Sequence, residues 1–161
     1  GGGGGGSARA APAHTVDDPS HFVIEEARAC EVPVDEPKPG VGAATPRMGV
    51  GLLDWSADSR FLAIRNDAMP FTVFVFSAVS CDMVAALTHL SPVRTFKWGP
   101  VGARLAIVTG NSKIFFWEPA GATCLCIKEG FSGVGLRWAA DGAKLMVLSR
   151  SSWTVGHLES W

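Results

Sequence analysis

From residue 48 onward, apolar residues gather in short segments that polar turns separate. Three of these segments run from an apolar residue through a tryptophan and a turn into a second apolar run, with leucine seven positions after the tryptophan. The tryptophans are Trp55, Trp98 and Trp138, which lie 43 and 40 residues apart. A period of about 40 residues is typical of repeat proteins in which each repeat forms one four-stranded sheet.

The segments of each repeat predict strands. They are rich in Val, Ile, Phe and Trp and are bounded by turn residues, such as the pair Asp141-Gly142, where glycine accepts a positive φ. No stretch keeps a 3.6-residue period over three turns, so we expect little helix. The strands expected after the tryptophans are 61–64, 104–109 and 144–149, then 72–76, 113–117 and 153–158, with fourth strands at 83–87 and 124–128.

The first 46 residues have a different composition. They are rich in Gly, Ala and Pro and open with six glycines. Such a segment buries too little apolar surface to offset its ordering entropy. We therefore divide the chain into a mostly disordered linker, 1–46, and the repeats, 47–161. Within the linker, the aromatic and β-branched residues of 20–26 predict one short strand.

The second repeat carries a family resemblance. His89 precedes its tryptophan strand, and Trp117-Glu118 ends a later strand. This pattern is similar to the Gly-His and Trp-Asp positions of the WD-repeat family of β-propellers. The resemblance implies a buried hydrogen-bonded tetrad of His89, Thr109, Asn111 and Trp117, weakened because Asn111 replaces a charged aspartate. The expected fold is all-β, a WD-repeat β-propeller fragment of two to three four-stranded blades.

A narrower resemblance covers residues 48–70 and 90–98. These runs are similar to the C-terminal blades of the subfamily of WD repeat-containing protein eight, from which Phe74 and Phe76 depart because tryptophans are expected there. The resemblance implies a cytoplasmic scaffold of the centrosome or spindle pole. Such a protein supports microtubule anchoring and spindle or cilium assembly, together with a coiled-coil protein partner.

Three repeats are too few to close a ring, because propellers have about four to eight blades. We therefore expect that the remaining blades of the polypeptide are missing from this chain, and that the native polypeptide is longer at its N-terminus. The blade next to the missing ones should expose an apolar face of Val, Ile, Phe and Trp.

Catalytic signatures are absent from the sequence. It has no Gly-x-Ser-x-Gly elbow and no Walker loop, and the run 49–51 lacks the third glycine of a dinucleotide fingerprint. We interpret His89 as structural and expect no enzyme activity and no cofactor. The cysteines have no C-x-x-C spacing, so buried reduced thiols are favoured over a metal site, although two of them share one face of a strand; they are Cys30, Cys81, Cys124 and Cys126.

Charge and hydropathy limit the classes of binding partner that we expect. The net charge of −1 gives no indication of nucleic acid, and no apolar run approaches the length of a membrane span. The partners expected are proteins. The candidate protein-binding rim is formed by Arg65, Asn66, Asp67, Met69, Arg94 and Lys97.

Alternatives stay open at this point. Residues 65–67 also fit a local Asx-turn that only fixes the loop. The chain also fits an adaptor subunit of another cytosolic or nuclear complex, in ubiquitin ligation or RNA processing. An enzymatic propeller would need inward His, Asp or Glu at repeat-related positions, where this chain has Trp, Leu and Ala.

Overall fold

The computed structural model describes residues 23–25 and 48–158, and all regular secondary structure in these ranges is β. The first sheet has the strand order β1-β5-β4-β3-β2 and is formed by β2 (Val50–Trp55), β3 (Phe61–Asn66), β4 (Thr72–Ser77), β5 (Met83–Thr88) and β1 (Val23–Glu25). The second is formed by β6 (Thr95–Trp98), β7 (Leu105–Val108), β8 (Lys113–Glu118) and β9 (Gly121–Cys126). The third is formed by β10 (Gly135–Trp138), β11 (Lys144–Leu148) and β12 (Trp153–His157).

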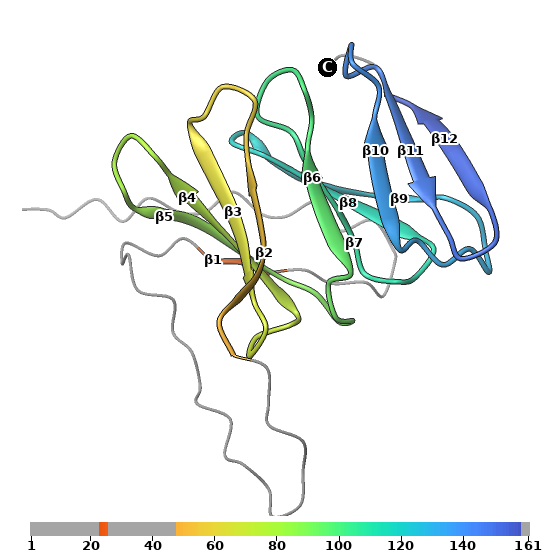
Figure 1. The fold of residues 1–161 in the computed structure, drawn as a ribbon, viewed down its shortest axis with the longest axis horizontal. Coiled ribbons are helices and arrows are strands. Elements are labelled where there is room, and N and C mark those ends of the chain that lie inside the picture. Colours follow the sequence, from red (N-terminus) through yellow and green to blue (C-terminus); the bar gives the residue numbers. More distant parts are fainter. Residues whose placement is uncertain (1–22, 26–47, 159–161) are drawn as a thin grey trace, which may run out of the picture.

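The three sheets stand side by side in chain order, and each is purely antiparallel (Figure 1). Their first strands, β2, β6 and β10, are neighbours, because β6 contacts both of the others. This is the arrangement of successive propeller blades, whose first strands lie toward the centre of a ring. The predicted all-β propeller fragment is therefore confirmed. We call the sheets blades 1, 2 and 3.

The predicted strands lie close to the observed ones, with one clear displacement. The last strand of blade 2 begins at Gly121, where 124 was expected. The reason is a tight turn, since Glu118 of β8 pairs directly with Gly121 of β9. In blade 3 the described residues form three strands.

The structure describes only a small part of the predicted N-terminal linker, residues 1–46. β1 lies within the range 20–26 where one short strand was expected, and it pairs with β5 at the outer edge of blade 1. The predicted disorder of the remaining linker concerns residues outside those that the structure describes.

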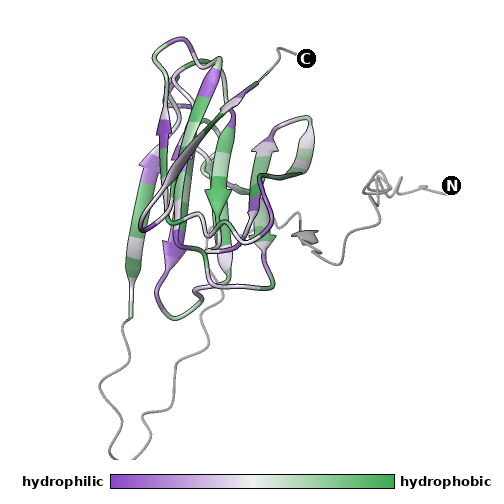
Figure 2. Ribbon diagram, turned by 90° about the vertical axis from the view of Figure 1, so that its right-hand side faces the viewer, coloured by the Kyte–Doolittle hydropathy of each residue, from purple (hydrophilic) through white to green (hydrophobic). Residues whose placement is uncertain are grey.

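Three apolar clusters hold the blades. Figure 2 shows the hydrophobic positions concentrated in the strands. One cluster joins blades 1 and 2, and its fully buried members include Val73, Leu105 and Ile107. A second joins blades 2 and 3 through Val108, Leu145 and other residues. A third lies on the opposite face of blade 1 and is formed by Ile64, Phe74, Met83 and Ala86.

The turn after each tryptophan strand has the same backbone geometry. Four residues after the tryptophan, φ is positive: 57° at Ser59, 70° at Gly102 and 72° at Gly142. A carboxylate one position earlier fixes two of these turns, because Asp58 accepts a hydrogen bond from the Arg60 amide and Asp141 does the same in blade 3. Bonds from the Ser56 hydroxyl and the Arg60 amide hold the pKa of Asp58 below its usual range. Both aspartates therefore have a structural role in these turns.

The positive φ in these turns predicts that two substitutions change the free energy of unfolding in opposite directions. Ser59→Gly is expected to raise the free energy of unfolding by up to about 1 kcal/mol, because glycine relieves the left-handed conformation. Gly142→Ala is expected to lower it by about 1 kcal/mol for the same reason. Urea unfolding of both variants checks the pair. Equal signs would show that the shared turn geometry is not what limits these positions.

Candidate protein-binding rim and the contacts between blades

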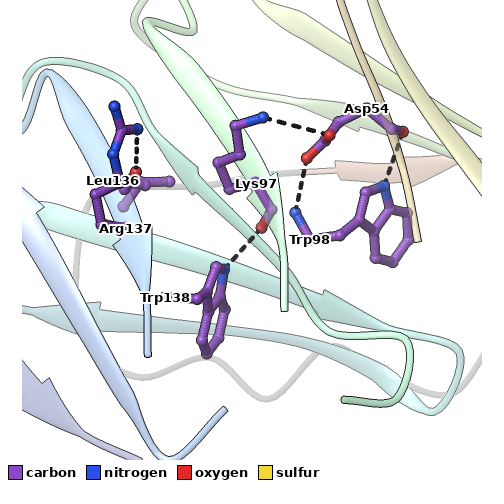
Figure 3. Close-up of polar contacts among 6 residues, drawn as sticks. All are labelled: Asp54, Lys97, Trp98, Leu136, Arg137 and Trp138. Atoms are coloured by element: carbon purple, nitrogen blue, oxygen red, sulfur yellow. Dashed lines mark hydrogen bonds and ion pairs between the residues drawn. The ribbon is translucent and has the colours of Figure 1, made fainter. Parts of the chain in front are cut away.

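The blades are joined by one repeated hydrogen bond. The indole Nε1 of Trp98 donates to the carbonyl oxygen of Asp54 at 3.0 Å, and that of Trp138 donates to the carbonyl oxygen of Lys97 at 3.1 Å (Figure 3). In both cases the acceptor immediately precedes the tryptophan of the blade before. The tryptophan of each of these blades therefore anchors it to its predecessor by the same contact.

The first junction carries an additional charged contact. The carboxylate of Asp54 accepts the backbone N–H of Trp98 at 3.1 Å and pairs with the ammonium of Lys97 at 3.3 Å (Figure 3). At the second junction the equivalent residues are Lys97 and Arg137, two cations. There the Arg137 guanidinium donates to the carbonyl of Leu136 in its own strand. The tryptophan strands of blades 1 and 2 are thus joined by more polar contacts than those of blades 2 and 3.

The three tryptophans occupy equivalent positions but different environments. Trp98 is 6% exposed and stacks on Phe61, and Trp117 packs edge-on against both rings. Trp138 is half-buried and meets the ring of Phe116 edge-on. Trp55 is 49% exposed.

The face of blade 1 that is exposed is equivalent to the face of blade 2 that packs against blade 1. Leu53 and Trp55 are 54% and 49% exposed, whereas their equivalents Phe96 and Trp98 are 3% and 6% exposed. The difference arises because blade 2 has a blade in front of it within the described residues and blade 1 has none. The expected open apolar face therefore lies at Leu53 and Trp55.

The expected tetrad is not hydrogen-bonded, and this interpretation is corrected. Both ring nitrogens of His89 and the hydroxyl of Thr109 are buried without a hydrogen-bond partner among the described residues. The indole of Trp117 lies instead in the aromatic cluster with Trp98, and Asn111 accepts the backbone N–H of Lys113 in its own turn at 3.0 Å. The tetrad does not form because Asn111 and Trp117 make other contacts, which leaves the polar atoms of His89 and Thr109 without partners.

His89 sits in an apolar environment. Its ring meets Phe115 edge-on at 4.6 Å between centroids, and the residue is 5% exposed. Burial lowers the pKa of His89 to about 4, because the charged imidazolium would be desolvated without a compensating partner. A neutral buried ring agrees with the structural role expected for this residue.

The rim residues of blade 1 are occupied with internal contacts. The guanidinium of Arg65 donates to the carbonyl of Val93 at 2.7 Å and pairs with Asp67 at 2.5 Å, which ties the loop to the segment before β6. Asn66 is buried, and its side chain accepts the amide of Ala68 at 2.9 Å. This geometry is an Asx-turn, so the structural reading left open for residues 65–67 describes these contacts.

The remaining rim candidates lie in different environments. Met69 packs against the apolar cluster of blade 1, and Lys97 lies within strand β6, where it contacts Asp54. Lys97 therefore makes a contact between blades, and its part in a protein-binding rim stays a prediction. Arg94 remains exposed just before β6. Sequence reasoning missed its neighbours Ser132, Ser149 and Arg150, because no local motif links residues from three separate segments.

The cysteines differ from expectation. Cys81 and Cys126 are exposed and Cys124 is half-buried, so the prediction of buried thiols was wrong for these three. Cys30 lies outside the described residues. Across residues 23–25 and 48–158, no three His, Cys, Asp or Glu side chains come close enough to hold a metal ion. The same ranges contain no helix that could span a membrane.

Comparison with known proteins places the chain. It is 43% identical over 125 residues to the mouse WD repeat-containing protein WRAP73, a match that covers 76% of this chain and 27% of the mouse protein. The chain thus spans about a quarter of that relative's length. No protein-family model matches the chain.

Solved structures agree on the fold. A chain of the mitotic checkpoint complex has a TM-score of 0.55 at 16% identity, covering 69% of this chain and 36% of its own length. A chain of dihydro-heme d1 dehydrogenase NirN has a TM-score of 0.55 at 15% identity, covering 68% and 26%. At this identity the likeness concerns architecture alone. With the sequence match to a WD-repeat relative and the stacked antiparallel blades, the chain belongs to the WD-repeat family of β-propellers.

Proposed function

We propose that residues 47–161 form adjacent blades of a larger WD-repeat propeller that acts as a non-catalytic scaffold for protein assembly. The observation that carries the proposal is the 43% identity to a WD repeat-containing protein, of which this chain matches 27%. The apolar side of blade 1 at Leu53 and Trp55 supports a further blade there, because the equivalent side of blade 2 is buried against its neighbour.

The scaffold's place in the cell is the second part of the proposal. Residues 48–70 and 90–98 resemble a centrosomal subfamily, so we place the protein at the centrosome or spindle pole, with a coiled-coil protein as partner. The other WD-repeat reading is an adaptor in ubiquitin ligation or RNA processing. The enzymatic reading draws on the dehydrogenase NirN, whose likeness at 15% identity concerns the fold alone.

Localisation tests this proposal. The full polypeptide that carries this chain would be fluorescently tagged and imaged against a centrosome marker, with proximity labelling of its neighbours. We expect focal signal at centrosomes or basal bodies in interphase and at spindle poles in mitosis, with coiled-coil proteins among the labelled neighbours. The tag alone is the control. Diffuse nuclear signal, or labelling dominated by ubiquitin-ligase or RNA-processing subunits, would favour the adaptor reading instead.

A further inference from the structure

Two arginines line one open hollow at the junction of blades 2 and 3. The hollow has a volume of about 620 Å³ and is lined by Arg94, Ser132, Val134, Ser149 and Arg150, which we call the arginine pocket. None of these five residues carries a carboxylate, and neither guanidinium has an ion-pair partner among the described residues. Arginine stays charged at all physiological pH values, so the pocket presents two uncompensated positive groups.

The segments that carry the pocket are fixed by backbone hydrogen bonds. The N–H of Arg94 donates to the carbonyl of Val108 at 2.8 Å, and that of Val134 donates to Leu148 at 2.7 Å. The N–H of Ser149 donates to the carbonyl of Ser152 at 2.7 Å. The side chains therefore project from anchored segments before β6, before β10 and after β11.

Gly110 holds one wall of the arginine pocket in place. A Cβ at this position, where φ is +84°, would lie 3.1 Å from the Nε atom of Arg94, so the absent side chain lets the guanidinium lie close to the backbone. The hydroxyl of Ser132 donates to the carbonyl of Gly110 at 2.7 Å. Arg94 and Ser132 are thus positioned against the same residue, which lowers the ordering cost of binding.

The donor set matches one kind of anion best. Guanidinium groups bind phosphate and carboxylate oxygens through paired hydrogen bonds, and the hydroxyl of Ser149 offers a further donor. A phosphate monoester carries nearly two charges and three acceptor oxygens, which match the charge and the donors of two guanidinium groups. Nucleic acid fits less well, because the lining has no aromatic ring for base stacking and the whole chain has a net charge of −1.

We propose that the arginine pocket binds a phosphorylated serine or threonine of a partner protein. The proposal rests on the scaffold function above and specifies one of its partners by chemistry. It makes the junction of blades 2 and 3 a contact that phosphorylation of the partner switches on.

The test uses the full polypeptide that carries this chain and peptide libraries with one fixed residue between randomised positions. The fixed residue is phosphoserine, serine or glutamate, and single-stranded RNA of equal length is a fourth probe. We expect retention of the phosphoserine library over the other three, and a loss of about tenfold or more in the variant R94Q/R150Q because both bidentate donors are gone. Inorganic phosphate should compete.

Two control variants make the result specific. Arg60→Gln removes the same charge in the turn after β2, outside the arginine pocket, and should leave retention unchanged. R94K/R150K keeps both charges but loses the paired geometry, so retention should fall between wild type and R94Q/R150Q. Unchanged urea midpoints would show that each variant is folded.

Several outcomes would contradict the binding of phosphoserine by the arginine pocket. They are equal retention of the phosphoserine and serine libraries, equal retention of the glutamate library, preferential binding of RNA, or an equal loss in Arg60→Gln. The localisation experiment fails independently of these. Selective phosphopeptide binding by a protein that is absent from centrosomes would retain the pocket and reject the cellular placement, and the reverse result would reject the pocket alone.

Discussion

Trp98→Ala is expected to lower the free energy of unfolding by about 3–5 kcal/mol. The indole is 6% exposed and lies between Phe61 and Trp117, so its removal leaves a cavity at the junction of blades 1 and 2. The substitution also removes the donor to the carbonyl of Asp54. Urea unfolding followed by circular dichroism measures the loss.

Trp55→Ala is the matched control, because Trp55 occupies the equivalent position in blade 1 and is 49% exposed. In this chain its removal should cost less than about 1 kcal/mol, as for other exposed positions. Similar losses for the two variants would contradict the assignment of Trp98, and not Trp55, to the contact between described blades.

Acidification is expected to weaken the fold through His89. Its pKa is about 4 in the folded chain against 6.5 when unfolded, so between these values the unfolded state binds a proton that the folded state excludes. The contribution of His89 is fully present above pH 6.5 and is lost as the pH falls toward 4. The slope is about 1.4 kcal/mol for each pH unit, which gives about 2 kcal/mol between pH 7 and pH 5.

His89→Leu isolates this effect. The leucine keeps an apolar side chain against Phe115 and removes two buried nitrogens without partners, so the variant should be as stable as the wild type at pH 7 or more so. It should also lack the wild type's additional loss of stability at pH 5. An identical pH dependence in both proteins would show that His89 is not the group that titrates.

The repeats were predictable because their sequence spacing reflects a pairing in the sheet. The leucine seven residues after each tryptophan is its cross-strand partner: Trp55 pairs with Leu62, Trp98 with Leu105 and Trp138 with Leu145. A turn of fixed length between two paired strands imposes this separation in every blade. The period and the strands thus follow from local geometry.

The contacts between blades could not be predicted in the same way. The bonds from Trp98 to Asp54 and from Trp138 to Lys97 join residues more than 40 positions apart. The contact of Lys97 with Asp54 also depends on this packing, so the sequence did not predict it.

The tetrad that the family resemblance implied does not form, because two of its members make other contacts. Asn111 caps its own turn and Trp117 enters the aromatic cluster, so His89 packs on Phe115 without a polar partner. The arginine pocket was not predicted from the sequence either. Arg94 and Arg150 are 56 positions apart and belong to no recognisable motif.

Hydrogen exchange of the indole N–H groups, followed by NMR, tests most directly whether the repeats stack through their tryptophans. Slow exchange is expected for Trp98 and Trp138, which donate to the blade before, and fast exchange for Trp55 and for Trp153, which is 65% exposed. Exchange at Trp98 and Trp138 as fast as at Trp55 would contradict the stacked-blade account.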